Sequence, residues 1–590
     1  MKTLAEIMAD YAFSLTYDSI PQEAMTAARR HLADSVACAL GAYNSAAARA
    51  VRRYAVEQGG RKDATIIGTE QKVPVGLAAL VGGTMVRYLD ANDIYVFSRG
   101  GPSGHFSDGT PALLALAEKH GRSGEDLLVC LVASYEIQAA LAASFNFWDC
   151  GLHAETNVAW VVPIVAARLM GATPKEAVHA CGLAVATGTV LNTWLRPGHN
   201  VPMIKGVAVG LVLERALEAA ELAALGVMAT EDALETVFSS LGRLSASAID
   251  PTYVEQLGSR WTTPRNMIKT YPAQLYTQAV IEATLSLYRN GIRADRVRKV
   301  TLYGHRSVCG GVQGSPEAFA PTSQEAADHS TPYVMAMALL RGRLTSREYD
   351  GSPWETSEVK ALMSKIELVR EPERDRAMDK DGILGVRLVA ELTDGRVEEA
   401  VVRQPKGHPD APLSDAELLE KMTSLLDGVA PADTPRRLLA LCSHLSTPED
   451  LKALTKPATS GKAERSLESL ALLCQRASAL LRVLLEPGGC LGWLDRLFPL
   501  RPSNRTDHAV LLVLLEGVQK AQGLIDIASD GQIIDLNSLD NAFGIDQEET
   551  AHRYSGCFLK HAVIGAHLFS KVREQGVFAS LDPALLARRL

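Results

Sequence analysis

The sequence lacks the close cysteine pairs on which many metal centres depend. None of its nine cysteines belongs to a C-x-x-C pair. Because zinc ribbons and iron–sulfur clusters need clustered thiolates, this scatter argues against both. Free and mostly buried thiols in a reducing compartment are the simpler interpretation. The cysteines stand at positions 38, 130, 150, 181, 309, 442, 474, 490 and 557.

Motifs for nucleotides, for other metals and for an activated serine are also missing. The sequence contains no G-x-G-x-x-G and no Walker A motif, so we expect neither a nucleotide nor a dinucleotide. It contains no H-E-x-x-H motif and no G-x-S-x-G nucleophile elbow. These absences predict a site with no metal and no cofactor.

Excess basic charge and long apolar runs are missing too. The 590 residues carry a formal net charge of −8, which does not fit the basic footprint of a nucleic-acid-binding protein. No run of 18 or more apolar residues is free of charges, and the first residues lack the apolar stretch of a signal peptide. We therefore expect a cytoplasmic protein with no membrane and no nucleic-acid partner.

From residue 1 to about 262 the sequence shows a helical pattern that is rich in small residues. Capping boxes at Thr173/Glu176 and Ser123/Asp126 mark helix starts. Stretches such as AVHACGLAVATGTVL indicate closely packed helices and not an open sheet. The predicted fold class is mainly α, with a large all-helical domain over 1–262 that 406–458 completes.

The pattern changes near residue 263. Alternating segments at 296–305 and in SKIELVRE predict strands, and 386–402 predicts a hairpin with Asp394-Gly395 as its two-residue turn. Between them, SQEAADHSTPYVMAMALLRG predicts one more helix. We therefore expect a smaller α+β lid domain over 263–405. A linker-like stretch then leads into 459–590, which is predicted to be a helical C-terminal extension of unknown role.

The first candidate for chemistry is the segment with Asp90, Asp93 and His105. Two acids three residues apart share a helix face, and taken alone they fit a solvated helix end better than an active site. A loop rich in glycine and serine then brings His105 to the start of a helix. Loops between helices often carry catalytic groups, and histidine can act as an acid or a base near neutral pH.

Four further segments carry chemically active side chains. A lone histidine before an apolar helix is more often structural, whereas a lysine among apolar residues must reach a partner or a ligand. A set of His, Lys, Tyr and Asp suits proton abstraction next to a carboxylate, with cations holding the anion. The residues are His153 near Glu155, Lys205 near Arg196 and His199, Lys269 with Tyr271 and Tyr276, and His329 with Ser330 and Tyr333.

Together these segments resemble the MmgE/PrpD family, which includes dehydratases, decarboxylases and epimerases. They occur in the family order and span roughly residues 1–455. The ordered set is fairly specific, although each segment alone is a weak signal. The matching segments are LDANDIY, GHFSDGTPALLALAE, GLHAETN, MIKGVAVG, KTYPAQLYTQ and EAADHSTPYVMAMALLRG.

The resemblance implies a helical large domain, an α+β lid, a homodimer and a small-molecule carboxylate substrate, with no metal. The sequence is most similar to the 2-methylcitrate dehydratase branch. Family site positions carry over to Asp90, His105, His153, Lys205 and Tyr333, and more loosely to Asp93 and Lys269.

The sequence departs from the family pattern in several places. Ile94 stands where the family often has a threonine that the decarboxylase branch uses in its pocket. The loop from Asp93 to His105 is longer than usual and carries Arg99, and Phe106 replaces the usual proline. The extension 459–590 has no counterpart in the family.

The leading hypothesis is a cofactor-independent lyase that dehydrates a polycarboxylate of the 2-methylcitrate type. His105 or Lys205 would move the proton next to a carboxylate, while Tyr333 and His153 would assist the leaving hydroxide or hold the intermediate. The substrate-binding residues would be Asp93, Lys269, Arg99, Tyr271 and His329.

Two alternatives stay open. One is epimerisation, isomerisation or decarboxylation of a related acid, including an acid of a biosynthetic pathway. The other is a non-catalytic binding protein on the same fold.

Overall fold

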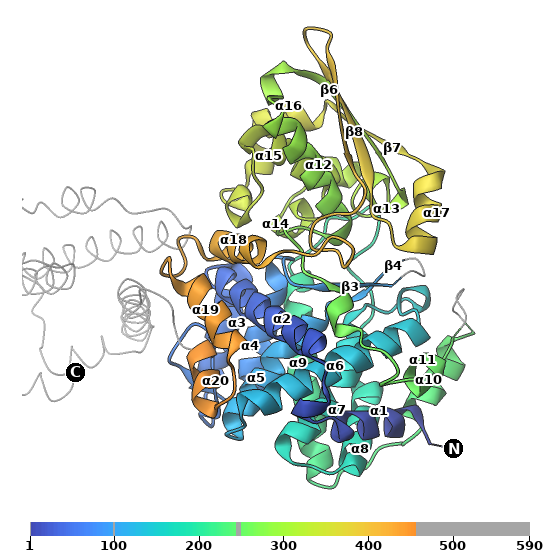
Figure 1. Cartoon of the computed structure of the whole chain (residues 1–590), viewed down its shortest axis with the longest axis vertical. Helices are drawn as coiled ribbons and strands as arrows, with labels where there is room; N and C mark the ends of the chain where they lie inside the picture. The colour runs from blue at the N-terminus through green and yellow to red at the C-terminus, as the bar shows by residue number, and fades with distance from the viewer. Residues whose placement is uncertain (1, 98–100, 244–248, 456–590) are drawn as a thin grey trace, which may run out of the picture. The chain divides into compact units, whose positions relative to one another are not determined.

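Helices make up most of the computed structural model of the chain, which describes residues 2–97, 101–243 and 249–455 (Figure 1). The sheets are small. This content confirms the predicted mainly α class. The predicted extension over 459–590 lies outside the described residues, as does Arg99.

The first part of the chain forms a bundle of helices. Thr173 accepts a hydrogen bond from the Glu176 amide, and Ser123 accepts one from that of Asp126, so both predicted capping boxes are confirmed. The helices are α1 (Leu4–Ser14), α2 (Gln22–Gly41), α3 (Ala46–Gln58), α4 (Val75–Tyr88), α5 (Thr110–Lys119), α6 (Gly124–Ser144), α7 (Glu155–Met170), α8 (Pro174–Thr187), α9 (Ile204–Ala224), α10 (Ala233–Leu241) and α11 (Thr252–Glu255).

Small residues let the central helices of this bundle approach closely. A Cβ added to Gly210 of α9 would stand 2.2 Å from the carbonyl oxygen of Leu80 in α4. A Cβ on Gly83 would in turn meet the backbone of Gly210 at 3.0 Å. Only glycine fits such a crossing, which agrees with the close packing predicted from the small-residue stretches.

One described helix, α6, is long and apolar enough to cross a membrane by length and composition. Its most apolar window is 89% buried inside the protein. A helix with apolar residues on every side is also what the core of a bundle contains, so this is weak evidence for a span.

Short strand pairs interrupt the helical pattern of the first part. The segment before His105, predicted as a loop, holds β3 (Ile94–Phe97) and β4 (Gly101–Gly104), which pair antiparallel. Strand β3 also pairs with β5 (Asn266–Met267), near the predicted domain change. The other pair is β1 (Ala64–Thr65) with β2 (Lys72–Val73).

A four-stranded sheet with helices follows, and we call residues 278–402 the sheet region. Its strand order is β7-β6-β8-β9, with β6 and β7 parallel and the other neighbours antiparallel. The strands predicted at 296–305 and in SKIELVRE are confirmed. Its elements are α12 (Gln278–Arg289), β6 (Val297–Gly304), α13 (Arg306–Cys309), α14 (Gln324–Ala327), α15 (Thr331–Arg341), α16 (Ser357–Met363), β7 (Ile366–Arg370), α17 (Pro372–Asp381), β8 (Val386–Leu392) and β9 (Val397–Val402).

The predicted hairpin is present, but its turn is wider than predicted. The amide of Leu392 donates to the carbonyl of Arg396, so three residues lie inside the closing pair. Gly395 has φ +87°, the left-handed position that ends a three-residue hairpin loop. The Asp394-Gly395 signal therefore located the turn correctly and gave the wrong length.

The segment predicted as one continuous helix breaks into α14 and α15. Ser330 caps α15, accepting a hydrogen bond from the amide of Tyr333. Pro332 follows within the first turn of α15, and it has no N–H to donate to the carbonyl of Asp328 as a continuous helix would require. The break leaves Asp328 and His329 in a connecting turn.

After the sheet region the chain returns to the helical bundle. Helices α18 (Asp415–Leu426) and α19 (Thr434–Ser443) pack on α2, and α20 (Pro448–Thr455) packs on α5 (Figure 1). Buried apolar side chains form two clusters, one with residues from 4–268 and 413–454, the other mainly with residues from 267–402. The exact domain boundaries stay a prediction.

Candidate active site

The end of α4 presents a buried carboxylate. Asp90, just past the helix, adopts a left-handed φ of +51°, a conformation that aspartate tolerates better than most residues. Its amide donates to the carbonyl of Arg87, and its Oδ1 lies 2.6 Å from Nη1 of the Arg87 guanidinium. Both side chains are almost fully buried. A strained turn and a buried ion pair thus fix one point of the site.

Two lysines from distant segments meet this carboxylate. Nζ of Lys269, which follows β5, is 2.5 Å from Oδ1 of Asp90 and 3.3 Å from the carbonyl of Ala273. Nζ of Lys205, in the first turn of α9, lies 3.3 Å from Oδ2 of Asp90 and 3.1 Å from Oδ2 of Asp328. Neither lysine has any exposed surface.

We call Arg87, Asp90, Lys205, Lys269 and Asp328 the Asp90 cluster. Burial alone would raise the pKa of Asp90, but the positive charges of Lys205 and Lys269 outweigh burial and hold it well below its usual range. Burial lowers the pKa of Lys269 to about 8, although Asp90 opposes that shift. Three cationic side chains thus face two carboxylates, and this buried excess of positive charge favours an anionic ligand.

The break between α14 and α15 adds a histidine to the cluster. Nδ1 of His329 is 2.5 Å from Oδ1 of Asp328, and its Nε2 is 3.8 Å from Oδ2 of Asp90. The sequence prediction included His329 but missed Asp328, because that segment was expected to continue as a helix. The same prediction missed Arg87, which reads as the polar end of an apolar helix.

His105 approaches the cluster from the turn before α5. Its Nδ1 donates to the carbonyl of Asp93 at 2.6 Å, because a carbonyl can only accept. Its Nε2 is left facing Oδ1 of Asp90 at 3.8 Å. Burial, with the charges of Arg87 and Lys269, holds the pKa of His105 well below its usual value. The neutral ring can therefore accept a proton at Nε2.

Asp93 supports His105 and does not itself face the cluster. Its Oδ1 accepts from the amide of Ser107 at 3.0 Å, and its Oδ2 lies 2.7 Å from the hydroxyl of Tyr135 and 3.1 Å from Nδ1 of His31. Protein donors thus satisfy both oxygens. The predicted substrate-binding role of this carboxylate therefore gains no support from the geometry, which favours an anchoring role.

Glu155 is the first residue of α7, and His153 stands two residues before it. Nδ1 of His153 is 3.6 Å from Oε2 of Glu155, and Oε1 of Glu155 is 4.0 Å from Nε of Arg87. Asp108 also lies 3.9 Å from that nitrogen. Burial raises the pKa of Glu155 to about 8 and that of Asp108 to about 7, although Arg87 opposes both shifts.

Two predicted site residues are not brought to the cluster. The hydroxyl of Tyr333 donates to the carbonyl of Glu348 at 2.5 Å, and its ring packs in the apolar cluster of the sheet region. Tyr271 packs against the same cluster. The structure instead places Tyr349 near Asp328, whose charge adds to burial in raising the pKa of Tyr349. Its hydroxyl donates to Pro272 at 2.8 Å.

The two substitutions that set this chain apart from the family lie in the apolar packing. Ile94 is buried with the apolar cluster of the sheet region. Phe106 stacks on Tyr95 with ring centroids 5.0 Å apart and meets Tyr135 edge-on at 5.9 Å. Phe106 therefore braces the turn that carries His105.

Asp90, Asp328 and His329 also bring possible metal ligands within 4.8 Å of one another. This donor set does not fit a divalent cation, because the ammonium group of Lys205 lies against both carboxylates and that of Lys269 against one. A metal ion there would have to displace or face two positive charges.

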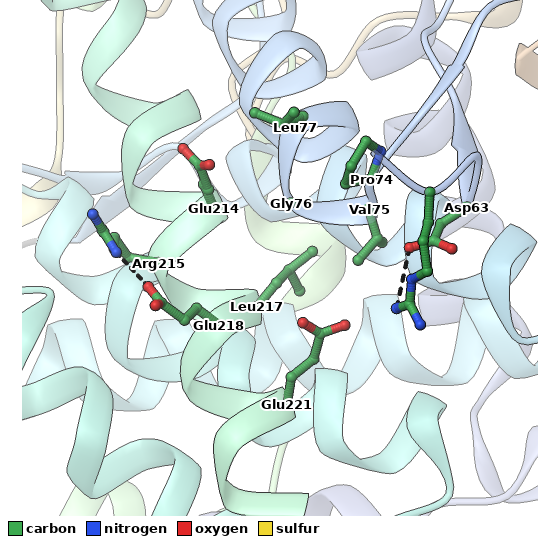
Figure 2. Close-up of a pocket in the computed structure, with 11 residues that line it drawn as sticks. Asp63, Pro74, Val75, Gly76, Leu77, Glu214, Arg215, Leu217, Glu218 and Glu221 are labelled. Carbon is green, nitrogen blue, oxygen red and sulfur yellow. Dashed lines mark hydrogen bonds and ion pairs between the residues drawn. The ribbon is translucent and has the colours of Figure 1, made fainter. Parts of the chain in front are cut away.

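A pocket of about 320 Å³ lies elsewhere, between α4 and α9 (Figure 2). Asp63, Glu214, Glu218 and Glu221 make its lining mainly acidic, with Arg61 and Arg215 paired to two of them. It contains none of the predicted site residues, and its charge disfavours a carboxylate.

Comparisons with known proteins give matches over most of the chain. Residues 6–247 match the MmgE/PrpD N-terminal domain, and residues 271–446 match the MmgE/PrpD C-terminal domain. A 2-methylcitrate dehydratase of Escherichia coli (strain K12) is 27% identical over 426 residues, which cover 68% of this chain and 86% of the relative. A cis-aconitate decarboxylase of Homo sapiens is 25% identical over 470 residues, which cover 77% and 94%.

Proposed function

The chain belongs to the MmgE/PrpD family, and on that premise we propose that it is a cofactor-independent dehydratase of a polycarboxylate of the 2-methylcitrate type. The observation that carries the proposal is the Asp90 cluster, a buried group with more positive than negative charge beside a neutral histidine. Such a site binds carboxylates and leaves one base free.

In the proposed reaction His105 is the base. Its Nε2 takes the proton from the carbon next to a carboxylate, and the electron pair of that C–H bond forms the new double bond. The neighbouring C–O bond breaks, and the hydroxyl leaves as water after taking a proton. Lys205 and Lys269 stabilise the negative charge that develops on the carboxylate, since preorganised cations are most effective in a buried site.

Between the two bases considered from the sequence, the geometry favours His105. Nζ of Lys205 is held between Oδ2 of Asp90 and Oδ2 of Asp328, at 3.3 and 3.1 Å. An ammonium that is paired twice is suited to holding an anion and poorly suited to accepting a proton.

The test is to incubate the protein with citrate, 2-methylcitrate, cis-aconitate and iminodisuccinate and to follow products by NMR in D₂O. Loss of water from a hydroxy acid supports the proposal. Release of CO₂ would identify a decarboxylase, and deuterium uptake without loss of water an epimerase. Binding without turnover would identify a non-catalytic protein.

The decarboxylase alternative is the weaker one on structural grounds. The resemblance placed a pocket threonine of the decarboxylase branch at the position of Ile94. Ile94 is 3% exposed, belongs to an apolar cluster and offers no hydroxyl. The site would therefore lack that polar contact.

We also propose that the protein is a homodimer. Support comes from exposed apolar side chains on and just after α9, among them Leu211, Leu225 and Met228, which are 46%, 83% and 76% exposed. Large apolar side chains left in contact with water favour association. Analytical ultracentrifugation should give a dimer for the wild type and a monomer for Leu225→Glu. A monomeric wild type would refute the proposal.

A further inference from the structure

The ring of His153 holds a buried proton donor that nothing in the described structure uses. The backbone N–H of Glu155 points at Nδ1 of His153, 3.4 Å away, and an N–H can only donate. The neutral ring therefore carries its proton on Nε2. His153 is 2% exposed, and Nε2 has no hydrogen-bond partner among the described residues. A buried donor without an acceptor indicates a bound group that completes it.

The carboxyl group of Glu155 is equally free. Both of its oxygens are buried without a hydrogen-bond partner in the described part of the chain. Oε2 lies 3.6 Å from Nδ1 of His153, which is close enough for a direct bond after a small movement. The two side chains thus form a path for a proton, from the Glu155 carboxyl to Nδ1 of His153 and from the imidazole to the unpartnered Nε2.

A second buried glutamate shows what a structural role looks like. The oxygens of Glu136 accept hydrogen bonds from the amides and hydroxyls of Thr262 and Thr263, at 2.5–2.9 Å. Glu136 thereby ties two segments together. Glu155 makes no such bonds, so its burial is not explained by a similar tie.

The surroundings of Glu155 favour a protonated carboxyl group that can still release its proton. Arg87 from α4, Asp108 from the turn before α5 and Lys205 from α9 are the charged groups that face it, besides His153. Burial keeps the carboxyl protonated near pH 7, because its pKa is about 8. Arg87, 4.0 Å away, would stabilise the carboxylate after the proton has left.

His153 is also close to the Asp90 cluster. Arg87 joins the two groups, because its guanidinium lies 4.0 Å from Oε1 of Glu155 and 2.6 Å from Oδ1 of Asp90. The charges of Arg87, Asp90 and Lys205 also act on the imidazole. A substrate held by the lysines would therefore lie beside the imidazole, with the base His105 on the same cluster.

We propose that Glu155 and His153 supply the proton that the leaving hydroxyl takes, a role that rests on the proposed dehydratase function. As the C–O bond breaks, its electron pair stays on oxygen, and that oxygen takes the proton from Nε2 of His153 and leaves as water. Nδ1 of His153 takes the proton of the Glu155 carboxyl in the same step. His105 then releases to solvent the proton that it removed from carbon. Nδ1 of His153 returns its proton to the Glu155 carboxylate while Nε2 takes a proton from solvent, which restores both groups before the next turnover.

The test compares two leaving groups in the variant Glu155→Gln. Glutamine keeps the size of the side chain and has no proton to release at this pH. With the hydroxy acid, kcat should fall about 10²-fold, with KM unchanged, since a general acid contributes on this order. With the analogue that carries fluoride in place of the hydroxyl, kcat should stay near the wild-type value, because fluoride leaves without a proton.

Two further readouts separate this role from a structural one. Deuterium uptake at the carbon that His105 deprotonates should persist in Glu155→Gln. The exposed Glu23 gives the matched control, Glu23→Gln, which should behave as the wild type. If Glu155→Gln does not fold, the same measurements on His153→Gln decide the question.

Equal losses on the hydroxyl and fluoride substrates, or no loss on either, would overturn the proposal. A wild type that releases no water from any hydroxy acid would refute the proposed function itself, and the role of this pair with it. If the wild type dehydrates a hydroxy acid and Glu155→Gln keeps full activity, only the proposed role of Glu155 and His153 is refuted.

Discussion

The two sides of the candidate site differ in how their charges are satisfied. Around Asp90, the lysines and carboxylates are paired at 2.5–3.3 Å, and the positive charges hold the pKa of Asp90 well below its usual range. Around Glu155, the nearest polar atoms stand 3.6–4.0 Å away and its oxygens make no hydrogen bonds within the described residues. In the proposed reaction the paired side holds the anionic substrate, and the unpaired side moves protons.

Removing one cation from the paired side should have the largest effect. Lys205→Met should lower kcat/KM about 10³-fold, because a preorganised charge on the reacting carboxylate is lost. It should also destabilise the fold by about 3–5 kcal/mol, since Asp90 and Asp328 lose a shared buried partner. Steady-state kinetics and urea unfolding measure the two effects. The control is Lys452→Met, an exposed lysine on α20. A fully active Lys205→Met would break the comparison.

The next largest effect is expected at the proposed base. His105→Gln should lower kcat about 10²-fold, the usual contribution of a general base. Because the same group removes the proton from carbon, deuterium uptake by the substrate in D₂O should fall in parallel. The exposed His444 supplies the control His444→Gln. Normal uptake in His105→Gln would assign the base to another group.

A smaller effect is expected in the way the stability of the fold depends on pH, through Glu155. The pKa of Glu155 is about 8 in the folded protein and near 4.5 when unfolded, so the folded state binds the extra proton. Stability from this group is complete below pH 4.5 and falls as the pH rises towards 8. Glu155→Gln removes that fall, so the Tm of the variant should rise relative to that of the wild type as the pH increases from 5 to 8. A constant Tm difference across that range would contradict the raised pKa.

The smallest effect is expected at Tyr333, which the sequence placed in the site. Its hydroxyl donates to the carbonyl of Glu348, away from the Asp90 cluster. Tyr333→Phe should cost about 1 kcal/mol of stability, the usual worth of one hydrogen bond, and leave kcat/KM unchanged. Thermal unfolding and steady-state kinetics check this. A large loss of activity would restore the catalytic role that the resemblance implied.

The sequence predicted the local structure well where a short-range rule governs it. The capping boxes of α6 and α8, the strands of the sheet region and the position of the β8–β9 hairpin all follow from neighbouring residues. It failed on the α14–α15 break, where periodicity predicted a continuous helix and Pro332 with the Ser330 cap decided otherwise.

The site was predictable in part for the same reason. His105, Lys205, Lys269 and His329 stand out because polar residues in apolar surroundings need partners. The sequence also predicted Asp90 as a site residue, but it did not predict that three cations would share this carboxylate. The direction of a side chain depends on packing between distant segments. Tyr333 lies four residues after His329, yet its ring turns into the core of the sheet region.

One contact of helix α18 affects the order in which parts of the protein can fold during synthesis. Nζ of Lys421 lies 2.5 Å from buried Asp34 and donates to the carbonyl of Ala91 at 2.7 Å, although 330 positions separate Lys421 from Ala91. The turn beside Asp90 thus gains its last support from a segment that leaves the ribosome long after the bundle helices. Domains fold in order during synthesis, N-terminal first. The nascent bundle must therefore wait for α18 before the turn beside Asp90 gains this support.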